Sequence, residues 1–214
     1  MFSDPSEIRS IVFDLDGTLY VCPPIAAEIE RAAAAMVAST RGVDLAQGRD
    51  LLRRARRRLG EMYDEEPTLT RTCLELGIDW PDFHLALQNG VHPERYLEYD
   101  PVLVALLDSL SEHCELYIYT NNNLALSQKI LALLGVQSLF RRIYTIEFTG
   151  LPKPDREAFF RVIDDIGGPP ESFLFVGDRE VVDLKVPRAH GSPALLVREA
   201  ADLLQIHKLL GLIP

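Results

Sequence analysis

The sequence contains few cysteines, no long apolar run and no excess of positive charge, and each shortage excludes a class of protein. Its three cysteines, Cys22, Cys73 and Cys114, are widely spaced and odd in number, which argues against a disulfide framework or a cysteine-type zinc site. No apolar run is long enough to span a membrane, and the first ten residues lack the basic and apolar regions of a secretion signal. We therefore expect a cytoplasmic protein with no membrane partner.

The charge balance argues against a nucleic-acid partner. The chain has 32 acidic residues and 22 Lys and Arg residues, so its net charge is −10 at pH 7. A small anionic substrate can still bind such a chain at a locally positive site. The arginine-rich segment RRARRRLG (residues 53–60) is interpreted as the solvated face of a helix, because its arginines fill the surface around an apolar stripe. The oligomeric state is left open.

Short apolar segments alternate with helical patterns along the chain, which is typical of a parallel sheet with crossover helices on both faces. The predicted strands are residues 11–13, 116–119, 143–146, 173–176 and 194–197. We therefore predict an α/β fold in which a parallel sheet lies between two layers of helices.

A long helical stretch interrupts this alternation after the first strand. Residues 20–98 carry helical patterns without strand signals, which is too long for an ordinary connection. We predict an inserted helical domain at residues 20–98 and an α/β core formed by residues 1–19 and 99–214. The chain would cross between them at hinges near residues 19–23 and 98–101.

The segment SIVFDLDGTLY (residues 10–20) ends a buried strand on two acids. Side chains alternate along a strand, so Asp14 and Asp16 turn to the same side, and Gly17 allows the backbone to curl directly after them. Two carboxylates that share a small space raise each other's pKa unless a cation lies between them. The pattern indicates a metal, a shared proton or both, or else an Asx-type turn that happens to contain two acids.

Polar residues also follow the other predicted strands of the core. Thr120 and Asn121 follow the second strand, Lys153 lies between two prolines after the third, and Asp178 and Asp183 follow the fourth. Ligands of open α/β sheets bind at the carboxyl ends of the strands, so we expect these loops to converge on one site. Hard oxygen ligands without a nearby Cys or His pair favour Mg²⁺, which often shares its coordination shell with a substrate phosphate.

Four segments in this order, DLDGTLY, TNN, KPD and GDREVVD, resemble the motifs of the haloacid dehalogenase (HAD) superfamily of phosphohydrolases. The resemblance covers nearly the whole chain. It implies a Rossmann-like core with a helical cap inserted after the first motif. It also implies a magnesium-dependent phosphatase that works through an aspartyl-phosphate intermediate.

The resemblance also implies roles for individual residues. Asp14 would be the nucleophile, Asp16 the general acid and then the general base, and Lys153 the cation that neutralises charge beside Asp14. Thr120 and Asn121, together with Lys153, would bind the substrate phosphate or support that loop. Magnesium would be held by the Asp14 carboxylate, the main-chain carbonyl of Asp16 and the Asp178 carboxylate, with Asp183 in or next to the coordination shell.

Elementary chemistry supports the same assignment. A carboxylate approaches a phosphate dianion only when cations screen both charges, and an alkoxide leaves readily only when it is protonated. Relatives that displace halide tend to lack a second acid at the position of Asp16, so its presence favours phosphate ester hydrolysis.

Further segments of the sequence indicate a class of substrate. Within the superfamily, DLDGTLY, TLTRTCLELGID and YTNN look like the pyrimidine 5′-nucleotidase branch. We expect a nucleoside 5′-monophosphate, with a sugar phosphate as the second choice. The alternatives are a phosphomutase of the same superfamily and a non-catalytic phosphate-binding or phosphoacceptor protein. The partner in every case is a small phosphate compound.

Overall fold

The computed structural model of the protein describes residues 8–64 and 67–213, and it contains a five-stranded parallel sheet in the order β3-β2-β1-β4-β5. The strands are β1 (Ser10–Phe13), β2 (Glu115–Tyr119), β3 (Arg142–Tyr144), β4 (Phe173–Gly177) and β5 (Ala194–Leu196). This confirms the predicted α/β class. The expected lack of a secretion signal depends on the first ten residues. Residues 1–7 lie outside the described range.

The register of the sheet brings the ends of its central strands together. Phe13 at the end of β1 pairs with Ile118 of β2 on one side and with Val176 of β4 on the other. The next residue continues the ladder, because the Asp14 N–H donates to the Val176 carbonyl at 2.8 Å. The loops after β1, β2 and β4 therefore begin at the same edge of the sheet.

The third strand ends earlier than predicted. We expected residues 143–146, but the strand covers Arg142–Tyr144, and Ile146 begins helix α7 (Ile146–Thr149). Ile146 is fully buried, and a buried apolar residue fits a helix as well as a strand.

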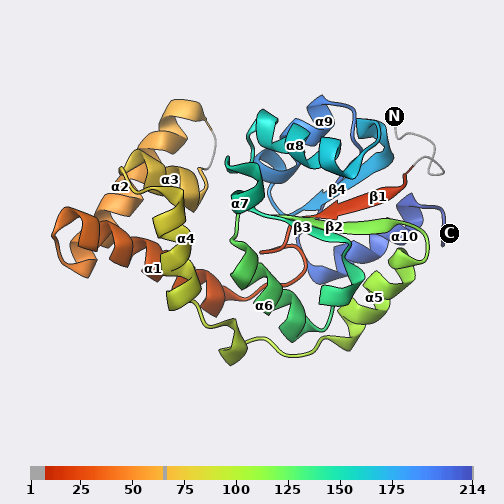
Figure 1. The fold of residues 1–214 in the computed structure, drawn as a ribbon, viewed down its shortest axis with the longest axis horizontal. Coiled ribbons are helices and arrows are strands. Elements are labelled where there is room, and N and C mark those ends of the chain that lie inside the picture. The colour runs from red at the N-terminus through yellow and green to blue at the C-terminus, as the bar shows by residue number, and fades with distance from the viewer. Residues whose placement is uncertain (1–7, 65–66, 214) are drawn as a thin grey trace. The chain divides into compact units, whose positions relative to one another are not determined.

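Helices cover both faces of the sheet, as Figure 1 shows. One face packs against α8 (Arg156–Ile166) in a cluster that includes Val12, Phe159 and Phe175. Residues at alternate positions, such as Ile11 and Phe13, point to the opposite face. That face is covered by α5 (Pro101–Ser111) and α6 (Leu124–Leu134), while α9 (Lys185–Ala189) and α10 (Gln205–Leu209) follow β4 and β5 in the chain.

Between β1 and α5 the chain forms a separate compact unit, Cys22–Tyr96, and the remaining residues form the other unit. The helices of this second unit are α1 (Pro23–Arg41), α2 (Leu45–Tyr63), α3 (Leu69–Glu75) and α4 (Trp80–Gly90). Helix α1 packs against both α2 and α4. That this helical unit acts as a cap stays a prediction. None of the described helices is both long and apolar enough to cross a membrane.

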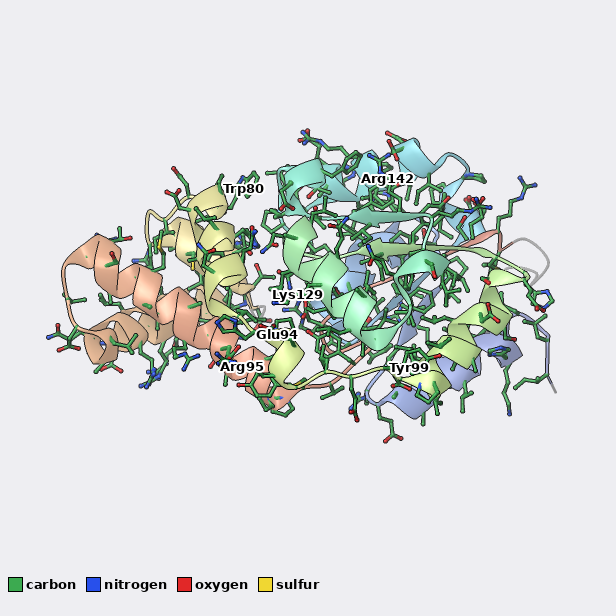
Figure 2. The ribbon with its side chains drawn as sticks, turned by 60° about the horizontal axis from the view of Figure 1, so that its bottom comes forward. Trp80, Glu94, Arg95, Tyr99, Lys129 and Arg142 are labelled. Atoms are coloured by element: carbon green, nitrogen blue, oxygen red, sulfur yellow. The ribbon has the colours of Figure 1, made fainter. Side chains whose placement is uncertain are left out.

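A buried carboxylate ties the first helix of this unit to its last segment. Glu28 of α1 accepts hydrogen bonds from the His92 N–H at 2.7 Å and from the Tyr96 hydroxyl at 2.9 Å. The Arg95 guanidinium, labelled in Figure 2, lies 3.7 Å from the same carboxylate. Burial raises the pKa of Glu28, but the two hydrogen bonds and the nearby arginine outweigh burial and hold that pKa below its usual value.

We expect Glu28→Gln to lower the free energy of unfolding by about 1–3 kcal/mol at neutral pH, because hydrogen bonds to a charged group are lost. The native pKa of Glu28 is lowered, so its contribution is complete above the unfolded value near 4.5 and disappears as the pH falls through the native pKa. Urea unfolding of the wild type and the variant at neutral and acidic pH measures this. The matched control is Glu30→Gln on the exposed side of α1, which should change stability by less than about 0.5 kcal/mol. Equal losses at both pH values would contradict this account.

Candidate active site

A buried lysine joins two acids at the edge where β1, β2 and β4 end. The Lys153 ammonium donates to Asp14 Oδ1 at 2.6 Å, to Asp183 Oδ1 at 2.7 Å and to the Tyr119 carbonyl at 2.8 Å. The side chains of Lys153, Asp14 and Asp183 are all 3–4% exposed. The structure thus brings together residues that are up to 169 positions apart in the chain, as the convergence of strand ends predicts.

Two glycines allow this close approach. Gly17 has a φ of +93°, and a Cβ atom there would lie 2.4 Å from Asp178 Oδ2. Gly177 ends β4, and a Cβ there would lie 2.4 Å from the Cβ of Asp183. Both glycines are therefore required for space, and Gly17 also for its backbone conformation.

Asp183 reaches the site from a single wide turn, η5 (Glu180–Leu184), that follows β4. The Arg179 N–H donates to Asp183 Oδ2 at 3.0 Å, and the Asp183 N–H donates to the Arg179 carbonyl at 2.9 Å. These two bonds fix the turn so that the other carboxylate oxygen, Oδ1, faces Lys153.

The three asparagines after β2 have different partners. Asn121 joins this loop to the lysine loop, since its Nδ2 donates to the Lys153 carbonyl at 3.2 Å and its Oδ1 accepts from the Lys153 N–H at 2.6 Å. Asn122 Nδ2 donates to Asp16 Oδ2 at 3.2 Å. Asn123 caps helix α6 by accepting from the Leu126 N–H at 2.8 Å. The first of these contacts is consistent with the supporting role predicted for Asn121.

Two threonine hydroxyls also lie at the site. Thr120 is buried, and its hydroxyl accepts from the Asn122 N–H at 3.1 Å. The Thr18 hydroxyl donates to Asp14 Oδ2 at 3.3 Å. Asp14 therefore has a hydrogen-bond donor on each of its carboxylate oxygens.

The acids of the site are buried and lie close together, and both conditions shift their pKa values. Burial and the charge of Asp183 raise the pKa of Asp14 to about 7, although Lys153 and Arg179 oppose this rise. Burial and Asp183 likewise raise the pKa of Asp178 to about 6. Burial alone would raise the pKa of Asp183, but Lys153 and Arg179 hold it below its usual value.

The same acids shift the pKa of Lys153. Burial lowers the pKa of Lys153, but the carboxylates of Asp14 and Asp183 outweigh burial and raise that pKa above its usual value. Lys153 therefore stays charged in the pH range in which its two partners titrate.

A second cation at the site, Arg179, was not predicted from the sequence. Its Nε lies 3.8 Å from Asp178 Oδ1, and it interacts electrostatically with all four acids of the site. The only signal in the sequence was its position directly after Asp178. No sequence pattern distinguishes an arginine at such a site from a solvent-exposed arginine in a loop.

The acidic cluster has the properties of a metal site. One carboxylate oxygen from each of Asp14, Asp178 and Asp183 lies within 4.8 Å of the others. Asp178 Oδ1 is buried and accepts no hydrogen bond from the described residues, so it has a free coordination position. With Asp16, four carboxylates surround the two cations Lys153 and Arg179, and a divalent cation would balance the excess negative charge. Oxygen donors of this kind fit Mg²⁺. The Asp16 carboxylate lies outside this cluster, so the metal role predicted for Asp16 depends on its main-chain carbonyl.

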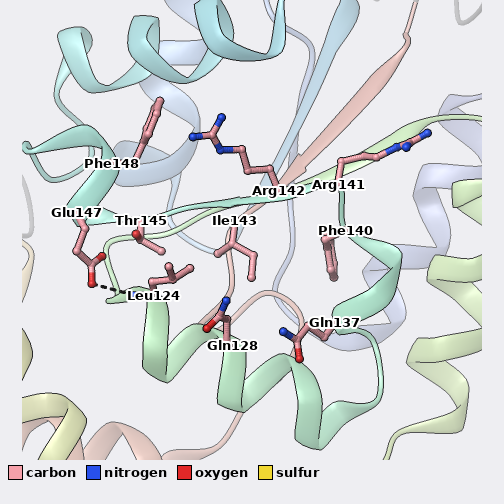
Figure 3. A pocket seen from close by; sticks show the side chains of 10 residues that line it. All are labelled: Leu124, Gln128, Gln137, Phe140, Arg141, Arg142, Ile143, Thr145, Glu147 and Phe148. Atoms are coloured by element: carbon pink, nitrogen blue, oxygen red, sulfur yellow. Dashed lines mark hydrogen bonds between the residues drawn. The ribbon is translucent and has the colours of Figure 1, made fainter.

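A separate pocket of about 480 Å³ opens along β3 and α6 (Figure 3). Its lining includes Gln128, Arg142 and Phe148, and Glu147 at its rim accepts from the Leu124 N–H at 3.0 Å. None of the predicted site residues lines it. The pocket is therefore separate from the candidate site at the strand ends.

The chain is similar to known hydrolases. A family model described as haloacid dehalogenase-like hydrolase matches residues 8–191. Glyceraldehyde 3-phosphate phosphatase of Methanopyrus kandleri is 27% identical over 197 residues, which cover 89% of this chain and 84% of that protein. Nothing in the comparisons points specifically to the pyrimidine 5′-nucleotidase branch.

Solved structures agree at the level of the fold. The HAD phosphatase from Thermococcus onnurineus has a TM-score of 0.62 at 17% identity, and the match covers 95% of this chain and 98% of that one. A HAD-hydrolase from Bacillus subtilis, solved bound to magnesium, has a TM-score of 0.59 at 22% identity, with 95% and 99% covered. The match of the family model over most of the chain confirms the predicted enzyme class: the protein belongs to the haloacid dehalogenase-like hydrolases.

Proposed function

We propose that this hydrolase is a magnesium-dependent phosphatase that cleaves a small phosphate monoester through an aspartyl phosphate on Asp14. The observation that carries the proposal is the buried Lys153 ammonium between Asp14 and Asp183, with Asp178 close by. In this proposal Asp14 is the nucleophile, and the cations beside it can offset the charge of a phosphate dianion.

In the first step, an Asp14 oxygen forms a bond to phosphorus as the bond from phosphorus to the ester oxygen breaks. Asp16 gives a proton to that leaving oxygen, which becomes an alcohol. In the second step, Asp16 takes a proton from water, and the water oxygen displaces Asp14 from phosphorus. Lys153 offsets the charge on the transferring group, Thr120 donates a hydrogen bond to it, and Asn121 keeps the lysine loop in place.

The metal would be held by the carboxylates of Asp14 and Asp178 and by the main-chain carbonyl of Asp16. When bound, Mg²⁺ would supply positive charge that stabilises the phosphoryl oxygens in the transition state. Asp183 would lie in or next to this coordination shell, and its Oδ1 accepts from Lys153.

The substrate we favour is a small sugar-type phosphate. The named relative from Methanopyrus kandleri is a glyceraldehyde 3-phosphate phosphatase, and its similarity extends over 89% of this chain. A nucleoside 5′-monophosphate remains the alternative that the sequence motifs suggest. In either case we propose that residues 20–98 act as the cap that selects the substrate, that residues 1–19 and 99–214 carry the chemistry, and that the protein works in the cytoplasm.

A phosphoacceptor or phosphate-binding protein is the second candidate, because Asp14 could take a phosphoryl group without rapid release. Asp16 argues against it, since a second acid beside the nucleophile serves turnover. A phosphomutase would use the same residues and differ only in the final acceptor.

We expect phosphate release from glyceraldehyde 3-phosphate to require Mg²⁺ and to fall at least about 10³-fold in Asp14→Asn, because the nucleophile is lost. A colorimetric phosphate assay over sugar phosphates, nucleoside monophosphates and p-nitrophenyl phosphate measures this. The matched control is Asp108→Asn on the exposed side of α5, which should retain wild-type rates. Preference for nucleotides would restore the alternative substrate, and a fully active Asp14→Asn would rule out the proposed mechanism.

We expect saturating Mg²⁺, at about 100 times its Kd, to stabilise the protein by about 2.7 kcal/mol and to raise the Tm by about 5–10 °C. In Asp178→Asn the shift should be largely lost, because a cluster carboxylate becomes neutral. Thermal unfolding with and without Mg²⁺, with Asp108→Asn as control, measures this. An undiminished shift in Asp178→Asn would place the metal elsewhere.

A further inference from the structure

The carboxylate of Asp16 is held by two neutral donors that no motif assigned to it. The Tyr20 hydroxyl donates to Asp16 Oδ1, and Asn122 Nδ2 donates to Asp16 Oδ2 at 3.2 Å. Asp14 and Asp183, by contrast, both accept from the Lys153 cation. All of these residues belong to the α/β unit.

Tyr20 reaches Asp16 because the chain folds back on itself after β1. The Leu19 N–H donates to the Leu15 carbonyl at 3.1 Å, and the Gly17 N–H donates to the Tyr20 carbonyl at 3.0 Å. This turn places residues 16 and 20 side by side in an isolated β-bridge. The Tyr20 side chain is largely buried, so solvent does not compete strongly for its hydroxyl.

Asn122 is equally constrained, and its constraints determine which end of its amide faces Asp16. Its side-chain oxygen accepts from the Asn123 N–H at 2.9 Å, so the NH₂ group points to Asp16. Its backbone N–H is bound to the Thr120 hydroxyl, and its side chain is buried. The contact to Asp16 spans 106 positions of sequence and joins the loops after β1 and β2.

We propose that Tyr20 and Asn122 are positioning residues that orient the Asp16 carboxyl for proton transfer in the reaction. This inference rests on the proposed function, in which Asp16 protonates the leaving oxygen. A general acid must lie within hydrogen-bond reach of the atom it protonates, and an aspartate held at only one oxygen can turn about its side-chain bonds. Two donors on two different oxygens stop this rotation.

The proposal makes a prediction that depends on the leaving group. An alkoxide needs the proton from Asp16, whereas p-nitrophenolate is stable enough to leave without it. Loss of either donor should therefore impair hydrolysis of an alkyl phosphate much more than hydrolysis of p-nitrophenyl phosphate. Because kcat/KM reports the steps up to departure of the leaving group, it is the quantity to compare.

The test is Tyr20→Phe, which removes the hydroxyl and keeps the ring. We expect kcat/KM for glyceraldehyde 3-phosphate to fall about tenfold or more, and kcat/KM for p-nitrophenyl phosphate to fall less than about threefold. The matched control is Tyr117→Phe, which removes a hydroxyl that donates to Glu115 at the other end of β2. It should leave both values unchanged.

A second variant keeps the test decisive if Tyr20→Phe folds poorly. Asn122→Ala removes the donor to Asp16 without adding a charge, so we expect the same asymmetry between the two esters. Equal losses on both esters, or no loss on either, would overturn the positioning role while the proposed function stands. A wild-type protein that hydrolyses no ester would overturn the proposed function, and the positioning role with it.

Discussion

The site depends on one buried ammonium group. Lys153 is bound to Asp14 at the end of β1, to the carbonyl of Tyr119 at the end of β2, and to Asp183 after β4. Removing an ion from water costs several kcal/mol, and a buried lysine is stable only when carboxylates and hydrogen bonds satisfy it. The loops after β1, β2 and β4 therefore lie close together because groups from all three strand ends must surround the Lys153 charge.

The same constraint explains the chemistry of the acids. Burial raises the pKa values of Asp14 and Asp178, and the negative charge of Asp183 raises them further, because the two cations do not balance the carboxylates around them. A site of this composition favours a divalent cation and, with it, the dianion of a phosphate ester. Gly17 and Gly177 matter because any side chain there would push the acids apart.

Much of this arrangement could be predicted from the sequence, because apolar segments that end in acids or donors mark the edge of a parallel sheet. Asp14, Lys153 and Asp183 were found in this way. Arg179, Tyr20 and Asn122 were not, since their roles arise from contacts that depend on tertiary structure and not on spacing. The end of β3 was misplaced for a related reason: Ile146 is buried as a strand residue would be, but it begins a helix.

We propose that the Asp14 carboxylate takes the phosphoryl group from the substrate. The most direct measurement is to quench the reaction in acid during turnover, reduce the protein with borohydride and sequence its peptides by mass spectrometry, because reduction converts an aspartyl phosphate to homoserine. We expect homoserine at position 14 and unmodified aspartate at position 16. Homoserine at another aspartate, or none during demonstrated turnover, would contradict it.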